Sequence, residues 1–176
     1  PDMKIIKRDA MSGKPIAGTV FSIKSVTSSY STSVTTGTDG SATLSAIPAG
    51  VYVVREESVP EPYVLSHTEQ TVALRPGKTS EVIFVDYKKP GLEILKKNIA
   101  TGEPIEGVTY LIEQIDGSYS TSATTDSSGR IFLDSIPVGS YRITEKNVPS
   151  HVILSEIPQE VYLEAGCTRT VTFFNA

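Results

Sequence analysis

The stretch MKIIKRD at residues 3–9 returns as LEILKKN at residues 92–98, an offset of 89 residues. The same offset relates matched pieces along the whole chain without a gap: GKPIAG at 13–18 matches GEPIEG at 102–107, and SYSTS at 29–33 matches SYSTS at 118–122. The repeat is too long for a solenoid unit, whose period is about 20–50 residues. The sequence therefore predicts a duplicated domain, with one copy in residues 1–88 and the other in residues 89–176.

Each half alternates short apolar segments with turn sequences. TDGS at 38–41 and its counterpart DSSG at 126–129 are typical hairpin turns, and RPGK at 75–78 is another turn. No segment shows helical periodicity. Many short strands separated by frequent turns favour an all-β sandwich. We therefore expect an all-β fold of two tandem β-sandwich domains.

Composition excludes several classes of function. The formal net charge is −4 and no basic run occurs, which argues against nucleic acid or an acidic membrane surface as a partner. No apolar run has transmembrane length, and no signal-peptide pattern is visible. The chain starts directly in a strand, so we expect a monomeric piece of a longer protein. We expect no cofactor, no metal and no turnover enzyme, because metal-ligand spacings, phosphate loops and nucleophile elbows are missing.

The single cysteine, Cys167, excludes an intrachain disulfide. Its counterpart in the first half is Lys78, in the same turn. We therefore interpret Cys167 as an incidental turn residue, although its role is not defined by the sequence.

Three polar residues in each half lie in phase with the apolar residues of their strands. Alternate side chains of a strand share a face, so these residues are predicted to point inward. They are Lys7, Glu56 and Asp86 in the first half and Lys96, Glu145 and Asn175 in the second.

Two interpretations of these residues remain open at this point. In the first, they form a buried ion-pair cluster, because an isolated buried charge is costly. In the second, burial lowers the pKa of the lysine and raises that of the glutamate, so that a neutral amine attacks the Asp or Asn side chain while the protonated glutamate polarises its carbonyl group. Loss of water from Asp86, or of ammonia from Asn175, would leave a Lys–Asx amide crosslink.

Each half resembles the collagen-adhesin B-type (CnaB) domain of Gram-positive surface proteins. The matching pieces are IKRD at 6–9, GKPIAG at 13–18, GVYVVRE at 50–56 and FVD at 84–86, with LKKN at 95–98, GEPIEG at 102–107, GSYRITE at 139–145 and FFN at 173–175 in the second half. The sequence departs from the family where Pro-x-Gly-Tyr often follows the glutamate: it reads PEPY at 60–63 and PSHV at 149–152.

The resemblance implies a prealbumin-like, immunoglobulin-related sandwich with spontaneous isopeptide bonds. Carried over residue by residue, the bonds join Lys7 to Asp86 and Lys96 to Asn175. Glu56 and Glu145 are the assisting catalytic residues of a single-turnover reaction.

The resemblance also implies a structural stalk or spacer in a cell-wall-anchored, extracellular adhesin or pilus. The expected partners are neighbouring repeats of the same parent protein, with host extracellular matrix contacted through other domains. The alternative is a ligand-binding adhesin module that recognises a host protein or glycan through the Ser/Thr/Tyr-rich stretches at residues 28–36 and 117–125.

Overall fold

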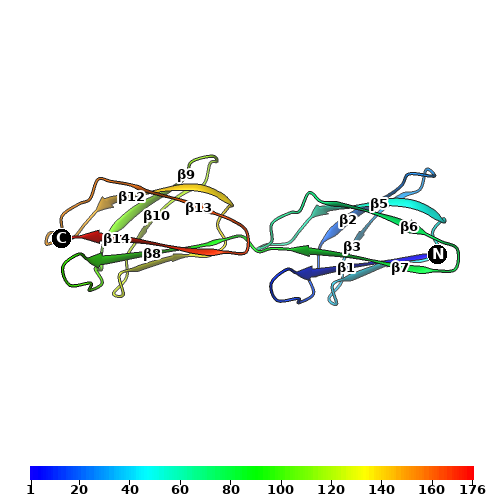
Figure 1. The fold of residues 1–176 in the computed structure, drawn as a ribbon, viewed down its shortest axis with the longest axis horizontal. Coiled ribbons are helices and arrows are strands. Elements are labelled where there is room, and N and C mark those ends of the chain that lie inside the picture. Colours follow the sequence, from blue (N-terminus) through cyan, green and yellow to red (C-terminus); the bar gives the residue numbers. More distant parts are fainter. The chain divides into compact units, whose positions relative to one another are not determined.

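The computed structural model describes all 176 residues and contains fourteen β-strands. The chain divides into two compact units, Pro1–Lys88 (unit 1) and Lys89–Ala176 (unit 2). Figure 1 shows the strands of each unit. The structure contains no helix that could cross a bilayer. The predicted all-β fold is confirmed.

Unit 1 consists of two sheets. A three-stranded sheet has the order β4-β1-β7, built from β1 (Asp2–Asp9), β4 (Ser41–Leu44) and β7 (Thr79–Asp86). A four-stranded sheet has the order β3-β2-β5-β6, built from β2 (Val20–Ser25), β3 (Ser31–Thr35), β5 (Gly50–Ser58) and β6 (Glu69–Leu74).

Unit 2 repeats this topology. Its three-stranded sheet has the order β11-β8-β14, with β8 (Gly91–Asn98), β11 (Arg130–Leu133) and β14 (Thr168–Asn175). Its four-stranded sheet has the order β10-β9-β12-β13, with β9 (Thr109–Gln114), β10 (Ser120–Thr124), β12 (Gly139–Asn147) and β13 (Gln159–Leu163).

The core of each unit lies between its two sheets, because strands of both sheets bury one face and expose the other. In β1 and β5 every second residue is buried, as period-two alternation requires. The buried core of unit 1 combines residues from both sheets: Met3, Ile5, Val82 and Phe84 from one, and Phe21, Ile23, Tyr52, Val54 and Leu74 from the other. Unit 2 has its own core, and the positions matched to these are buried there too: Leu92, Ile94, Tyr110, Ile112, Tyr141, Ile143, Leu163, Val171 and Phe173.

The first and last strands of each unit are neighbours. β1 pairs with β7 in parallel over eight residues, and β8 pairs with β14 in the same way. This pairing is the feature of the fold that positions the site, because it brings residues from the two ends of each unit together.

The Ser/Thr-rich stretches form edge strands. β3 and β10 lie at the edges of the four-stranded sheets, and in both strands partly buried residues alternate with exposed ones. Tyr30 and Tyr119, which precede these strands, pack edge-on against the core residues Tyr52 and Tyr141.

Candidate functional site

The lysine and the Asx residue of each unit come from neighbouring parallel strands. Lys7 on β1 lies opposite Phe84 on β7, and Asp86 is the next inward-facing residue of β7. The backbone of Lys7 is held on both sides, since its N–H donates to the Gly40 carbonyl at 2.7 Å and its carbonyl accepts from the Ile16 N–H at 3.1 Å. Local hydrogen bonding thus fixes where the lysine leaves the sheet.

The hairpin turn that clamps this lysine requires glycine. Gly40 has a φ of +74°, and a Cβ added there would lie 2.6 Å from the Lys7 carbonyl oxygen. Gly129 repeats both features against Lys96, with a φ of +68° and a distance of 2.5 Å. A larger residue would therefore force the lysine strand to move in either unit.

The glutamate reaches the same place from the opposite sheet. Glu56 is the last inward-facing residue of β5, and its Oε2 accepts a hydrogen bond from the backbone N–H of Ser66 at 2.9 Å. Glu145 on β12 repeats this arrangement, with the Ser155 N–H 2.5 Å from its Oε2. The backbone N–H therefore orients each carboxylate toward the lysine on the facing sheet.

In unit 1 the three side chains meet inside the core. Lys7 Nζ lies 2.5 Å from Glu56 Oε1 and 2.7 Å from Asp86 Oδ2, and the exposed fractions of the three side chains are 0 %, 0 % and 1 %. These are ion-pair distances, yet the Lys7 amine has no partner with the angles of a hydrogen bond. The amine therefore lies in contact with the Asp86 carboxyl group, but its angles to the carboxyl oxygens are not those of a hydrogen bond.

Electrostatics in unit 1 favour a protonated Asp86. Burial raises the pKa of Asp86, Glu56 raises it further and Lys7 opposes the shift, which leaves it at about 7. Near neutral pH the cluster consequently retains a proton on a carboxyl group beside the lysine.

In unit 2 the glutamate bridges the lysine and the asparagine. Glu145 Oε1 accepts a hydrogen bond from Lys96 Nζ at 2.6 Å, and its Oε2 accepts one from Asn175 Nδ2 at 2.7 Å. Asn175 Nδ2 also donates to the Ile153 carbonyl at 2.7 Å. One carboxylate thus contacts both the amine and the amide nitrogen.

The pKa shifts in unit 2 differ in part from the sequence-based expectation. Burial lowers the pKa of Lys96, as predicted, although Glu145 opposes the shift. Burial alone raises the pKa of Glu145, but hydrogen bonds from Lys96, the Ser155 N–H and Asn175 outweigh it and leave the pKa lowered. The predicted raised glutamate pKa is therefore wrong for Glu145, because its donors stabilise the ionised form. The raised carboxyl pKa occurs at Asp86 instead.

In each unit the structure brings together the three residues that the strand phase singled out. Their inward orientation is confirmed, with exposed fractions from 0 % to 6 %. Sequence reasoning missed three contributors: the backbone N–H groups of Ser66 and Ser155, and the Tyr110 hydroxyl, which donates to Glu145 Oε1 at 3.1 Å. Of these, only Tyr110 could have been found from the sequence, because the repeat aligns its polar side chain with the apolar Phe21.

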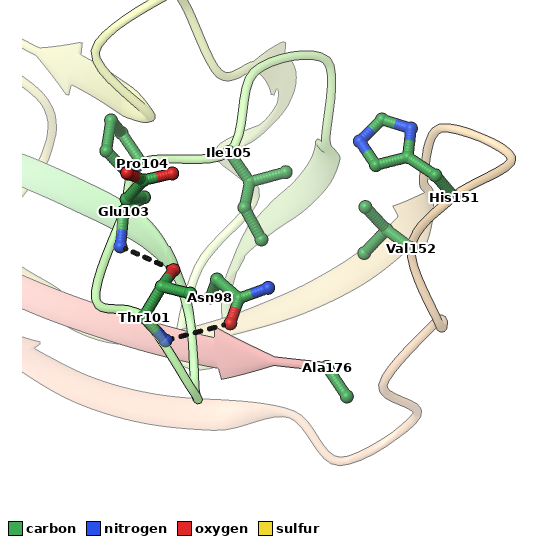
Figure 2. Close-up of a pocket in the computed structure, with 8 residues that line it drawn as sticks. All are labelled: Asn98, Thr101, Glu103, Pro104, Ile105, His151, Val152 and Ala176. Carbon is green, nitrogen blue, oxygen red and sulfur yellow. Dashed lines mark hydrogen bonds between the residues drawn. The ribbon is translucent and has the colours of Figure 1, made fainter.

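A second polar contact lies beside the unit 1 cluster and is lost in unit 2. The Tyr63 hydroxyl donates to Asp9 Oδ2 at 2.7 Å. At the matched positions unit 2 has Val152 and Asn98, and a pocket of about 250 Å³ opens between them, as Figure 2 shows. The remaining lining residues are Thr101, Glu103, Pro104, Ile105, His151 and Ala176. We interpret the pocket as the space that a tyrosine ring occupies in unit 1.

Replacing Tyr63 by Phe is expected to lower the free energy of unfolding of unit 1 by about 1–2 kcal/mol, because Asp9 loses a charge-assisted hydrogen bond. The Tyr63 hydroxyl and the Ser12 N–H lower the pKa of Asp9 to about 2. Because the pKa of Asp9 is lower in the folded state, the ionised carboxylate stabilises the fold at pH values above its unfolded-state pKa. This stabilisation disappears as the pH falls through about 2. Calorimetry of the full chain at neutral and strongly acidic pH checks both effects.

The matched control is Tyr87→Phe, whose side chain is 47 % exposed and which should leave stability unchanged. An equal loss of stability in Tyr63→Phe at neutral and strongly acidic pH would contradict the assignment to the Asp9 carboxylate.

Comparison with known proteins gives a consistent picture of the fold. The family model described as the SpaA prealbumin-like fold domain matches residues 1–88 and again residues 90–176. A search of curated protein sequences finds no match.

Among solved structures, the chain is similar to the Bacillus anthracis TIE protein, at 23 % identity and a TM-score of 0.53, over 98 % of this chain and 33 % of that one. It is also similar to the shaft pilin SpaA from Lactobacillus rhamnosus GG, at 18 % identity and a TM-score of 0.52, over 99 % and 97 %. GBS52, the minor pilin of Streptococcus agalactiae, matches at 18 % identity and a TM-score of 0.50, over 99 % and 94 %. The chain thus spans about a third of the Bacillus anthracis protein. At these identities the similarity establishes the fold.

Proposed function

Because both halves of the chain belong to the family of SpaA prealbumin-like fold domains, we propose that the chain is a structural stalk or spacer module of a Gram-positive surface protein or pilus. Each unit is closed by a self-formed isopeptide bond. One observation carries the proposal: a fully buried lysine amine lies 2.7 Å from a carboxyl group on the neighbouring strand, with a glutamate 2.5 Å from the same amine.

In unit 1 the reaction is a condensation between Lys7 and Asp86. The ammonium group transfers a proton to Glu56, and the neutral amine attacks Cγ of the protonated Asp86. Glu56 then delivers the proton to the departing hydroxyl group and takes up a second proton from the attacking nitrogen. The products are one amide and one water, and the amide nitrogen keeps one hydrogen. The Asp86 pKa of about 7 helps, because hydroxide leaves poorly unless it is protonated and an ionised carboxylate resists attack.

In unit 2 the same steps release ammonia. Lys96 gives a proton to Glu145 Oε1 and attacks Cγ of Asn175, whose leaving nitrogen lies on Glu145 Oε2. Glu145 returns a proton to that nitrogen, so that an ammonium side chain and an amide become one new amide and one ammonium ion. The reacting groups are held in contact by the fold, and such positioning supplies much of the acceleration in reactions of this kind.

The crosslink positions suit a load-bearing role. A pulling force that enters unit 1 at Pro1 and leaves at Lys88 passes from β1 to β7. An amide between Lys7 and Asp86 carries the load directly and bypasses residues 8–85. In this role the partners are neighbouring repeats and other subunits of the surface protein, which holds a binding tip away from the cell wall. Contact with host extracellular matrix belongs to other domains of that protein.

The intact mass of the purified chain under denaturing conditions tests the proposal. We expect the chain to be lighter than its sequence by one water plus one ammonia, because each unit loses one small molecule on closure. An unchanged mass would mean that both clusters are only buried polar groups, and the proposed crosslinked stalk would be abandoned.

The variant Asp86→Asn is the matched control. Before closure it differs from the natural chain by the exchange of a carboxyl hydroxyl for an amine. After closure both proteins contain the same Lys7 amide, so their masses become identical. Two chains that keep their initial mass difference would show that unit 1 has not closed.

A further inference from the structure

The two units differ by one hydroxyl group beside the glutamate. Phe21 on β2 occupies the position that Tyr110 occupies on β9. Both rings are fully buried, and both pack against the phenylalanine of the last strand with ring centroids 4.8 Å apart, at interplanar angles of 53° and 49°. The ring is therefore placed identically in the two units, and only the hydroxyl is added in unit 2.

That hydroxyl binds the oxygen that faces the lysine. Tyr110 donates to Glu145 Oε1 at 3.1 Å, and Lys96 donates to the same atom at 2.6 Å. The matched atom in unit 1, Glu56 Oε1, has the Lys7 amine at 2.5 Å and no second donor. The hydroxyl thus occupies a site on the carboxylate that stays empty where Phe21 stands.

The need for this donor follows from the residue at the end of the last strand. In unit 1 Lys7 contacts two carboxyl groups. In unit 2 Asn175 carries no charge, so Glu145 alone holds the lysine through Oε1 and the leaving nitrogen through Oε2. A rotation of this carboxylate would break one contact or the other.

We propose that Tyr110 is a positioning residue for closure of unit 2, an inference that rests on the proposed isopeptide reaction. Its hydroxyl fixes Glu145 Oε1, while the Ser155 N–H fixes Oε2 from the other side. The carboxylate then contacts the Lys96 amine through Oε1 and the Asn175 amide nitrogen through Oε2. Oε1 can take a proton from Lys96 while Oε2 delivers one to the leaving nitrogen of Asn175. Tyr110 keeps its own proton throughout, because it is a neutral donor in the cluster and burial disfavours its ionised form.

The test follows closure of the newly synthesised full-length chain, quenched in denaturant at timed intervals and weighed. Tyr110→Phe is expected to slow the loss of ammonia from unit 2 about tenfold, the effect of removing one hydrogen bond. Loss of water from unit 1 in the same molecules should keep its rate. Tyr162→Phe, which removes a hydroxyl from a tyrosine that is 53 % exposed, is the matched control and should change neither rate.

The pH profile of closure distinguishes positioning from general packing. The groups that face Glu145 are Lys96 on β8, Tyr110 on β9, the neutral Asn175 on β14 and the Ser155 N–H. Closure needs the ionised glutamate as proton acceptor, so its rate falls when Glu145 becomes protonated. Removal of a donor raises a carboxyl pKa, and Tyr110→Phe should therefore move this acid limb to higher pH.

The reciprocal variant, Phe21→Tyr, should move the acid limb of unit 1 to lower pH. It decides the question if Tyr110→Phe does not fold. An unchanged rate and an unchanged acid limb in both variants would overturn the role of Tyr110 while leaving the isopeptide proposal in place. A slower rate with an unmoved acid limb would also overturn it, since that pattern indicates packing alone. Absence of any ammonia loss in the natural chain would overturn the isopeptide proposal for unit 2 itself.

Discussion

Pulled from its two ends, the natural chain is expected to show no unfolding step from either unit. The load in unit 1 passes through the proposed Lys7–Asp86 amide, and residues 8–85 never come under tension. Asp86→Ala removes the acceptor and leaves the 2.5 Å Lys7–Glu56 ion pair in place. In this variant unit 1 should open in one step and lengthen the chain by roughly 280 Å, at about 3.6 Å per released residue. Single-molecule force spectroscopy of the full chain measures this step.

Asn175→Ala is the matched variant of unit 2 and should release a step of the same length, because Lys96 and Asn175 are separated by the same number of residues as Lys7 and Asp86. The double variant should show two steps. Before each step the parallel ladder between the first and last strands resists in shear, since the force acts along eight paired residues. Two steps in the natural chain would contradict the proposed load path.

The positions of the six site residues could be predicted because the strands are regular. A lysine in phase with Met3 and Ile5 must face the core if those residues do, and the repeat tests the same statement at Lys96. The same pattern occurs in both halves of the chain, so the prediction has more support than one strand alone would give. The pairing of the first strand with the last was implied by the family resemblance, and the structure gives its register.

The hydrogen-bond partners of the site could not be predicted from strand phase. The N–H groups of Ser66 and Ser155 come from loops, where no periodicity relates sequence to direction. The sequence also could not predict which carboxyl groups are protonated, because this depends on burial and on the number of hydrogen-bond donors around each of them. Hydrogen bonds from Lys96, the Ser155 N–H and Asn175 lower the pKa of Glu145, whereas burial and then the nearby Glu56 raise the pKa of Asp86.

The loss of a tyrosine in unit 2 illustrates the same limit. The sequence shows that Tyr63 is matched by Val152 and Asp9 by Asn98. Without the fold these were loop differences of no evident consequence. The structure links the two differences. In unit 1 a hydrogen bond joins Tyr63 to Asp9. In unit 2 a pocket lies between Val152 and Asn98, as Figure 2 shows.

Replacement of the glutamates by glutamine is expected to slow closure of the unit concerned and of no other. Glutamine keeps the shape of the side chain but cannot accept a proton from the lysine. General acid–base catalysis contributes about 10²–10⁴-fold to reactions of this kind. Glu56→Gln should therefore slow the loss of water and leave the loss of ammonia unchanged, and Glu145→Gln should do the reverse. Intact mass of the two variants, followed over time after synthesis, separates these outcomes, and Glu57→Gln, on an exposed neighbour, should behave like the natural chain.

The two glutamates should not be equally important. In unit 1 the amine of Lys7 also lies 2.7 Å from Asp86 Oδ2, and the fraction of Asp86 that is ionised near its pKa of about 7 can take the lysine proton and become the protonated acceptor. In unit 2 Glu145 is the one carboxylate beside Lys96, and it also holds the leaving nitrogen of Asn175. We expect the rate to fall by about 10² for Glu56→Gln and about 10⁴ for Glu145→Gln, the two ends of the range for acid–base groups. Equal losses would mean that Asp86 accepts no proton from Lys7, and that both units depend on their glutamate in the same way.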